Sequence, residues 1–261
     1  MMFHRGVASA TNTERLRRIT DAVREAGRLG VAELAALTGA SEMTIRRDLE
    51  LLADQGVLER YRGGARSLLL RGEEPPFALR SGEGRDVKRR IAAEVAGLIA
   101  DGESVVLDSG TTCVEVAHAL EQRRLTVMPL SLHAVNALSG GPRLTLLVPG
   151  GRPRPGELAL TGPLTLASLA ALRFDTAVVG CCGLNAEHGL TAYDLDDAAV
   201  KRAAIASARR VVAVTEGAKL TRTALAFVAP ASALHAVVTD DSAPREETEA
   251  LAAAGVTVRR A

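Results

Sequence analysis

Apolar residues near the start of the chain recur at the three- and four-residue spacing of helices. One stripe runs through residues 16–26 and a shorter one through 31–37, with glycines after each. Ser41 is a natural N-cap for a third helix, whose apolar stripe is spread over residues 45–52. We therefore expect three helices here, the second short and joined to the third by a tight turn.

The third helix has the residue pattern of a helix that reads DNA. At about 100° per residue, Met43, Thr44, Arg46 and Arg47 lie opposite or beside the apolar stripe. In a helix-turn-helix, the start of the second helix enters the major groove, where an arginine fork binds guanine or a phosphate. Exposed arginines are also common on ordinary amphipathic helices, so spacing alone leaves a solvated helix face open.

A hairpin is predicted directly after this helix. Residues 57–62 read as a strand, and Gly63-Gly64 can supply the positive φ of a tight turn. This hairpin would form a wing, with Arg60, Arg62 and Arg66 within reach of a DNA backbone. A winged helix-turn-helix domain over residues 13–66 is the expected fold.

From residue 87 to the end, short apolar runs alternate with helical patterns. Such alternation predicts an α/β domain with a buried, mostly parallel sheet. The Pro- and Gly-rich stretch 67–86 reads as a linker before it. The expected strands are 104–107, 125–128, 144–148, 176–179, 211–214, 236–239 and 256–258, and the expected helices are 87–100, 112–120, 162–172, 195–208 and 245–253.

Composition narrows the function classes. The net charge of +1 predicts no field over the whole molecule for nucleic acid or membrane, so a binding site must come from local charge. Three cysteines without metal-ligand spacing indicate neither a zinc site nor a disulfide framework, and no bound cofactor is expected. No stretch reads as a signal peptide or membrane span, which predicts a soluble, cytoplasmic protein without a membrane partner.

Polar residues that follow the predicted strands indicate an anion pocket. Ligands of parallel sheets bind beyond the carboxyl ends of the strands, and glycines, hydroxyls and cations at a helix N-terminus suit a phosphate. Each piece alone could be an ordinary capped loop. The candidate ligand-binding residues are Asp108, Ser109, Gly110, Thr111, Thr112, Ser131, Gly151, Arg152, Lys219 and Arg222.

Lysine usage adds a clue to this pocket. Only three of the 32 basic residues are lysines, namely Lys88, Lys201 and Lys219. A sequence with so few lysines is expected to keep them where a compact ammonium matters. Lys219, in a glycine-containing loop after a strand, is the best candidate for a ligand contact, whereas chance can explain the two lysines on predicted helices.

Two sets of motifs resemble one known family. The runs Val31-Ala-Glu-Leu-Ala, Ser41-Glu-Met-Thr-Ile-Arg-Arg-Asp-Leu-Glu and Arg60-Tyr-Arg-Gly-Gly-Ala65 strongly resemble the DeoR family of bacterial transcription regulators. The later part resembles that family's sensor domain, through Leu107-Asp-Ser-Gly-Thr-Thr112, Gly150-Gly151 with Gly162-Pro163, Gly189-Leu-Thr191, Ala198-Ala-Val-Lys201 and Lys219 with Arg222.

The resemblance implies a ligand-gated regulator, most readily a repressor. It implies a sensor domain at 87–261 that is similar in fold to sugar-phosphate isomerases and binds a phosphorylated sugar or related metabolite without turnover. Operator DNA read by Ser41, Met43, Thr44, Arg46, Arg47, Arg60 and Arg62 is the implied partner, and a homo-oligomer is expected. The alternative is a sugar-phosphate isomerase or deaminase with an accessory DNA-binding domain. Cysteines at 181 and 182, where related isomerases carry carboxylates, disfavour it.

Overall fold

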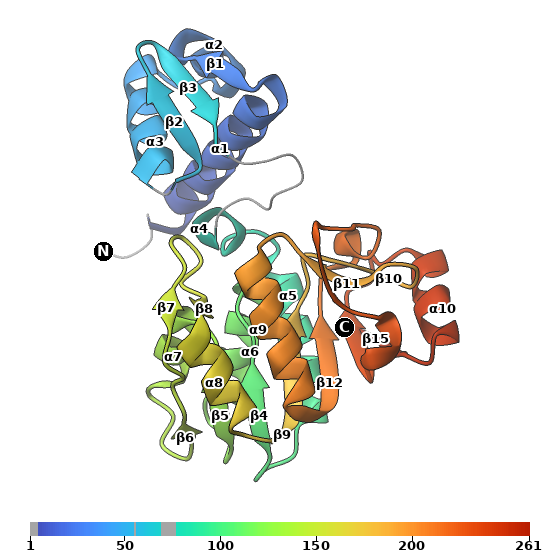
Figure 1. The fold of residues 1–261 in the computed structure, drawn as a ribbon. Helices are drawn as coiled ribbons and strands as arrows, with labels where there is room; N and C mark the ends of the chain where they lie inside the picture. Colours follow the sequence, from blue (N-terminus) through green and yellow to red (C-terminus); the bar gives the residue numbers. More distant parts are fainter. Residues whose placement is uncertain (1–4, 55, 69–76) are drawn as a thin grey trace. The chain divides into compact units, whose positions relative to one another are not determined.

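The computed structural model describes residues 5–54, 56–68 and 77–261 of the chain. Its contacts divide the chain into two units, Met1–Glu83 and Gly84–Ala261 (Figure 1). The stretch expected to be a linker, 67–86, lies on both sides of this division. Its residues 69–76 fall outside the described part of the chain.

The first unit is the winged helix-turn-helix that the sequence predicts. The apolar stripes of its helices meet in one core, to which Leu79 also contributes although it lies far along the chain. The short strand β1 was not expected, and it completes a sheet of order β1-β3-β2. The elements are α1 (Arg5–Ala26), β1 (Arg28–Gly30), α2 (Val31–Thr38), α3 (Glu42–Asp54), β2 (Leu58–Tyr61), β3 (Gly64–Ser67) and α4 (Phe77–Arg80).

Glycines set the two sharp reversals of this unit. Gly39 ends α2 at φ 72°, where its N–H binds the carbonyl of Ala35. Gly63 turns the wing hairpin at φ 96°, and a side chain at Gly64 would collide with the carbonyl oxygen of Leu29. The turn between α2 and α3 and the wing are therefore fixed by local sequence.

The second unit is built on a seven-stranded sheet in which every neighbouring pair is parallel. All seven expected strands are found in it, which confirms the predicted α/β sheet. The order is β15-β14-β12-β9-β4-β5-β6. The strands are β4 (Ser104–Leu107), β5 (Thr126–Pro129), β6 (Thr145–Leu146), β9 (Phe174–Gly180), β12 (Ala208–Val214), β14 (Ala236–Thr239) and β15 (Thr257–Arg260).

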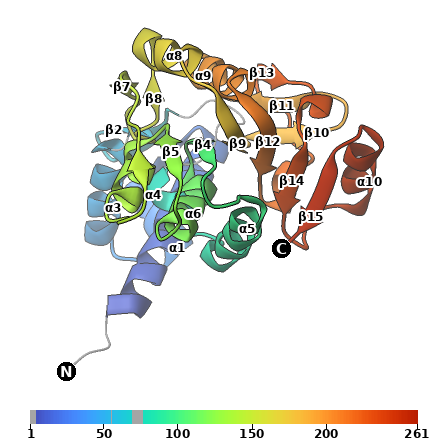
Figure 2. The ribbon, with the colours of Figure 1, turned by 90° about the horizontal axis from the view of Figure 1, so that it is seen from below.

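Alternate residues of these strands pack into two hydrophobic cores, one on each face of the sheet, because successive side chains of a strand point to opposite faces. Val105 and Leu107 join the core under α5 (Arg85–Leu98), α6 (Thr111–Leu120) and α7 (Leu132–Leu138). Val106 joins the other core, under α8 (Pro163–Ala170) and α9 (Leu195–Ala206). Figures 1 and 2 show the two helical layers on either side of the sheet.

Small elements beyond the main sheet were largely unexpected. Strands β10 and β11 form a hairpin that pairs with β13, and β7 pairs with β8. No described helix combines the length and apolar character needed to cross a membrane. These remaining elements are β7 (Arg152–Pro153), β8 (Leu160–Thr161), β10 (Gly183–Asn185), β11 (Gly189–Ala192), β13 (Ala226–Ala229), α10 (Arg245–Ala253) and the 3-10 turns η1 (Gly217–Lys219) and η2 (Ala231–Ala233).

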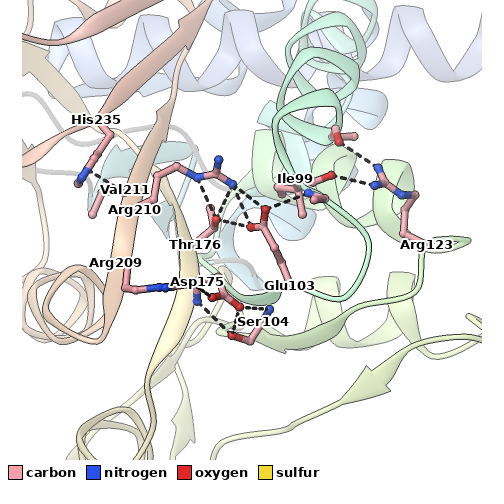
Figure 3. A network of polar contacts seen from close by, with 12 residues as sticks. Ile99, Glu103, Ser104, Arg123, Asp175, Thr176, Arg209, Arg210, Val211 and His235 are labelled. Carbon is pink, nitrogen blue, oxygen red and sulfur yellow. Dashed lines mark hydrogen bonds and ion pairs between the residues drawn. The ribbon is translucent and has the colours of Figure 1, made fainter.

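The amino-terminal edge of the sheet is closed by a polar network (Figure 3). Arg210 at the start of β12 donates to Glu103 Oε2 at 2.9 Å and to Thr176 Oγ1 at 2.7 Å. Asp175 accepts from both the N–H and the hydroxyl of Ser104 at 2.8 Å. These contacts link β4, β9 and β12 where the three strands begin.

The strand order places a switch point between β4 and β9. The chain extends the sheet from β4 toward β6 and then returns to the other side of β4 with β9. Loops that leave two such strands diverge above the carboxyl edge, where α/β proteins bind ligands. The candidate pocket of this chain is therefore expected at that edge.

Candidate functional site

The start of α3 is capped as the sequence predicts. Ser41 Oγ accepts from the backbone N–H of Thr44 at 3.2 Å and lies 2.9 Å from the Thr44 hydroxyl. Ile45, Leu49 and Leu52 are buried in the core of the first unit. The opposite side of the first two turns therefore faces outward.

This outward side carries the predicted DNA-reading residues. Met43 is 59% exposed, and both arginines are exposed. Arg46 is held by Glu42, one turn earlier, at 2.9 Å. Arg47 makes no hydrogen bond or ion pair with any residue that the structure describes, so its guanidinium is available to a base or phosphate.

The wing arginines differ in their partners. Arg66 is engaged by Glu59 across the hairpin at 2.8 Å, and Arg60 lies 3.7 Å from Glu50 of α3. Arg62, beside the turn, is exposed and has no polar partner among the described residues. Arg62 is therefore the wing cation best placed to meet a phosphate.

At the carboxyl edge of the second unit, one carboxylate joins the two strands of the switch point. Asp108 follows β4, and its Oδ2 accepts from the N–H of Gly180, the last residue of β9, at 2.9 Å. Gly110 then adopts φ 101° and α6 begins at Thr111. The loop expected to hold a phosphate thus lies between the ends of β4 and β9.

Hydroxyl groups gather at the start of α6. Ser109, Thr111 and Thr112 are nearly buried. The hydroxyls of the two threonines form no hydrogen bond within the described part of the chain. The first N–H groups of a helix also lack partners inside it. Donors of this kind at a helix N-terminus are suited to an anion.

All three lysines lie at this same edge. Lys201 of α9 is 97% buried, pairs with Asp108 and lies 3.4 Å from Asp197. Lys219 of η1 donates to the carbonyl oxygen of Cys181, just after β9, at 3.2 Å. Lys88 of α5, also buried, lies 3.6 Å from Glu216, just after β12. The strands involved, β12, β9 and β4, are neighbours at the centre of the sheet.

Sequence reasoning chose Lys219 as the ligand contact, and it placed Lys201 only in a motif that resembles the family. Chance was left open as an explanation for Lys88 and Lys201, but both ammonium groups are buried against carboxylates. Burying an unpaired ammonium costs far more than leaving it in water, so such lysines are committed to their partners. Their rarity in the sequence was the available signal.

Burial and charge act against each other in this cluster. Burial raises the pKa of Asp108, opposed by Lys201 and reinforced by Asp197. Burial alone would lower the pKa of Lys201, but the carboxylates of Asp108 and Asp197 raise it well above its ordinary value. The lysine therefore stays charged and holds the two carboxylates together.

Two of the cysteines at this edge are buried thiols with raised pKa values. Cys113 and Cys181 are buried. Burial raises the pKa of Cys181 to about 12 and also raises that of Cys113. A raised pKa favours the protonated thiol at neutral pH, which disfavours a role for either cysteine as a nucleophile or base.

The remaining predicted ligand residues fall into two groups. Ser131 is fully buried at the end of β5 and caps α7, accepting from Ala134 N–H at 3.2 Å. Gly151, at φ 130°, leaves no room for a side chain against Thr165. Arg152 is 80% exposed, 3.9 Å from Asp196, and the Arg222 side chain is also exposed. The structure therefore does not bring these two arginines into the buried cluster.

Two family descriptions match the chain. Residues 15–69 match the DeoR-like helix-turn-helix domain, and residues 83–241 match the DeoR C-terminal sensor domain. The two matches correspond to the two units of the structure, and the second match ends before α10 and β15.

Named proteins are similar to the chain over most of its length. The glycerol-3-phosphate regulon repressor of Escherichia coli (strain K12) is 31% identical over 89% of this chain and 92% of its own length. The HTH-type transcriptional regulator GlpR of Haloferax volcanii is 32% identical over 94% and 96%. The transcriptional repressor AccR of Agrobacterium fabrum is 31% identical over 87% and 89%.

A solved structure shows a weaker similarity. Ribose 5-phosphate isomerase A of Methanocaldococcus jannaschii resembles 53% of this chain and 56% of its own, with a TM-score of 0.40 at 17% identity. A similarity of this strength does not by itself assign a fold or an activity.

Proposed function

Because the chain belongs to the DeoR family of transcription regulators, we propose that it is a repressor whose affinity for its operator depends on a phosphorylated sugar or similar metabolite. Matches to a DNA-binding domain and a sensor domain in one chain support this function. The observation that carries it is the outer face of α3, where Arg47 is exposed without a partner among the described residues.

The DNA contacts follow from this exposed face. We place the start of α3 in the major groove, with Ser41, Met43, Thr44, Arg46 and Arg47 toward the bases and nearby phosphates. The wing adds backbone contacts from Arg60 and Arg62. An operator with two-fold symmetry is bound by two copies of the DNA-binding domain, so we propose that the chain works as a homo-oligomer. We also propose that it acts in the cytoplasm, where it can reach chromosomal DNA.

The effector site is proposed at the switch point of the sheet. The residues from Asp108 to Thr112 offer N–H groups and hydroxyls at the start of α6, and Lys219 supplies a cation at the same edge. The glycerol-3-phosphate regulon repressor, by its name, is linked to a small phosphorylated metabolite. We extend that ligand class to this chain, with Gly151, Arg152 and Arg222 as outer contacts and with Ser131, which caps α7, in a supporting role.

Effector binding is proposed to relieve repression. A coupling of about 1–3 kcal/mol between the two sites changes operator affinity roughly 5–150-fold, which is sufficient for control. Binding without turnover is supported by the state of the groups at the site. Asp108 is engaged by Lys201 and by Gly180 N–H, and the high pKa of Cys181 keeps that thiol protonated. Isomerisation needs a free general base.

One experiment tests the DNA and effector parts together. The full chain is used to enrich a sequence from a pool of random duplexes, and binding to the enriched duplex is then measured with ribose 5-phosphate, glucosamine 6-phosphate or glycerol 3-phosphate. At least one phosphosugar should weaken binding, and Lys219→Ala and Thr111→Val should lose the response without losing DNA binding. Failure to enrich any sequence contradicts the DNA function, and unimpaired responses in both variants contradict the site.

The non-enzymatic part has its own test. The chain is incubated with ribose 5-phosphate or glucosamine 6-phosphate, and the formation of ketose or ammonia is followed. No product above background is expected. Turnover above background would instead support the isomerase or deaminase alternative.

A further inference from the structure

A buried carboxylate lies on the core side of the recognition helix. Asp48 of α3 is 6% exposed, although Ile45, Leu49 and Leu52 on the same side of the helix are apolar. Its partner is Arg15, in α1, whose Nε donates to Oδ2 at 2.6 Å and whose Nη2 donates to Oδ1 at 3.1 Å. The two parallel bonds make this a bidentate pair.

The pair is poorly explained by stability alone. Replacing even a fully buried ion pair with apolar residues of similar volume is often neutral or stabilising, and in this pair the Arg15 side chain is 24% exposed. A fork that binds both carboxylate oxygens instead fixes a direction as well as a distance. Arg15 is itself braced, because its Nη2 also donates to Asn12 Oδ1 at 2.6 Å.

The position of Asp48 makes that direction matter for DNA reading. Arg47 precedes it by one residue, or about 100° around the helix. Any rotation of α3 about its axis therefore moves Arg47 away from a base by the same angle. Helix α1 also contacts the end of α2, on the other side of the turn that leads into α3. There Arg18 Nη2 donates to the carbonyl oxygen of Leu37 at 2.6 Å.

We propose that Arg15 and Asp48 are positioning residues for operator recognition, which set the rotation of α3 so that Arg47 meets its base. The inference rests on the proposed DNA function and adds to it a pair that does not touch DNA. Loss of the Arg15–Asp48 pair should therefore lower discrimination between DNA sequences. General DNA affinity should be kept, because contacts to phosphates tolerate small rotations of the helix.

The test compares the enriched duplex with a scrambled duplex of the same composition. Asp48→Asn and Arg15→Gln are each expected to lower the ratio of specific to scrambled affinity about tenfold, the size of one lost bidentate base contact. Arg17→Gln is the matched control, because Arg17 lies on the same helix but pairs with Glu14, Asp21 and Glu83 rather than with α3. It should leave that ratio unchanged.

A double variant separates positioning from general destabilisation. If the two residues act only through each other, Arg15→Gln/Asp48→Asn should lower the ratio no more than either single change. Destabilisation would lower binding to both duplexes alike. Arg15→Lys keeps the charge beside Asp48 but cannot form two parallel bonds, so it carries the test if Asp48→Asn does not fold.

The outcomes are distinct. If the wild-type chain enriches no sequence, the proposed DNA function fails. If it enriches a sequence and Arg15→Gln, Arg15→Lys and Asp48→Asn, where folded, discriminate as the wild type does, the function stands and the positioning inference is overturned. Equal losses on the enriched and scrambled duplexes also overturn it.

Discussion

The cations at the two candidate sites are used in opposite ways. In the first unit, Arg47 and Arg62 are exposed and have no polar partner among the described residues. In the second, Lys201 is buried between two carboxylates. An exposed arginine can bind a polyanion without first breaking an ion pair, whereas a buried lysine is already committed. What surrounds a cation therefore indicates its role better than the local charge count.

The two edges of the sensor sheet repeat this contrast. Arg210 at the amino edge is satisfied by Glu103 and Thr176 (Figure 3). No helix start is expected there, because in βα units the helices begin beyond the carboxyl ends of the strands. The carboxyl edge combines its ion pairs with the start of α6 and its unbonded threonine hydroxyls. We therefore regard the amino edge as part of the scaffold, and the ligand site that we propose lies at the carboxyl edge.

The largest effect is expected from removing the buried ammonium group of Lys201, which tests whether this cation is needed for folding. Lys201→Met leaves Asp108 and Asp197 buried without their counter-charge, which should destabilise the second unit by about 3–5 kcal/mol. Urea unfolding of the full chain measures the loss. Adding Asp108→Asn should recover part of it, and an unchanged unfolding midpoint for Lys201→Met would show that the ammonium is not the centre of the cluster.

An exposed arginine should behave differently, with its effect on binding rather than on folding. Arg47→Ala is expected to weaken operator binding by about 1–3 kcal/mol and to relax specificity at one base pair. Its unfolding midpoint should not move, because Arg47 has no partner in the described chain. Arg46→Ala is the comparison, with a smaller loss expected because Glu42 already engages Arg46. Equal losses from the two variants would contradict the distinction between paired and unpaired arginines.

The wing should show a weaker and less selective effect. Arg62→Ala is expected to lower affinity alike for specific and random duplexes, and to reduce the slope of log affinity against log salt by about 1. Titrations at several salt concentrations measure this slope. A change confined to the enriched sequence would place Arg62 on a base instead of a phosphate.

The sequence predicts those parts of the fold that depend on local pattern. The central strands of the parallel sheet contain short apolar runs, because helices cover both faces of the sheet there, whereas the edge strand β15 ends in two exposed arginines. Strands β7 and β8 have only two residues each and lack such a signature. Ser41 and Gly63-Gly64 likewise predict their turns, since cap and hairpin geometry depends on neighbouring residues.

The site is predicted less completely, because its essential contacts join distant residues. Lys201 and Asp108 are 93 positions apart, and Arg15 and Asp48 are 33 apart. The periodic spacing of apolar residues in helices and strands does not predict which distant residues form such pairs. The exposure of Arg152 was also not visible, since a cation after a strand can turn toward the ligand or toward water.

A paired cation at the surface should matter least. Arg209 is 81% exposed and pairs with Asp175, and exposed pairs contribute about 0–1 kcal/mol. The N–H and hydroxyl of Ser104 lower the pKa of Asp175, and Arg209 lowers it further. The stabilisation from this ionised carboxylate is therefore present above its ordinary pKa and is lost as pH falls through the lowered value. Urea unfolding of Arg209→Ala should show a small deficit at neutral pH that vanishes in acid. A deficit that persists after Asp175 is protonated would mean that Arg209 acts through contacts other than this pair.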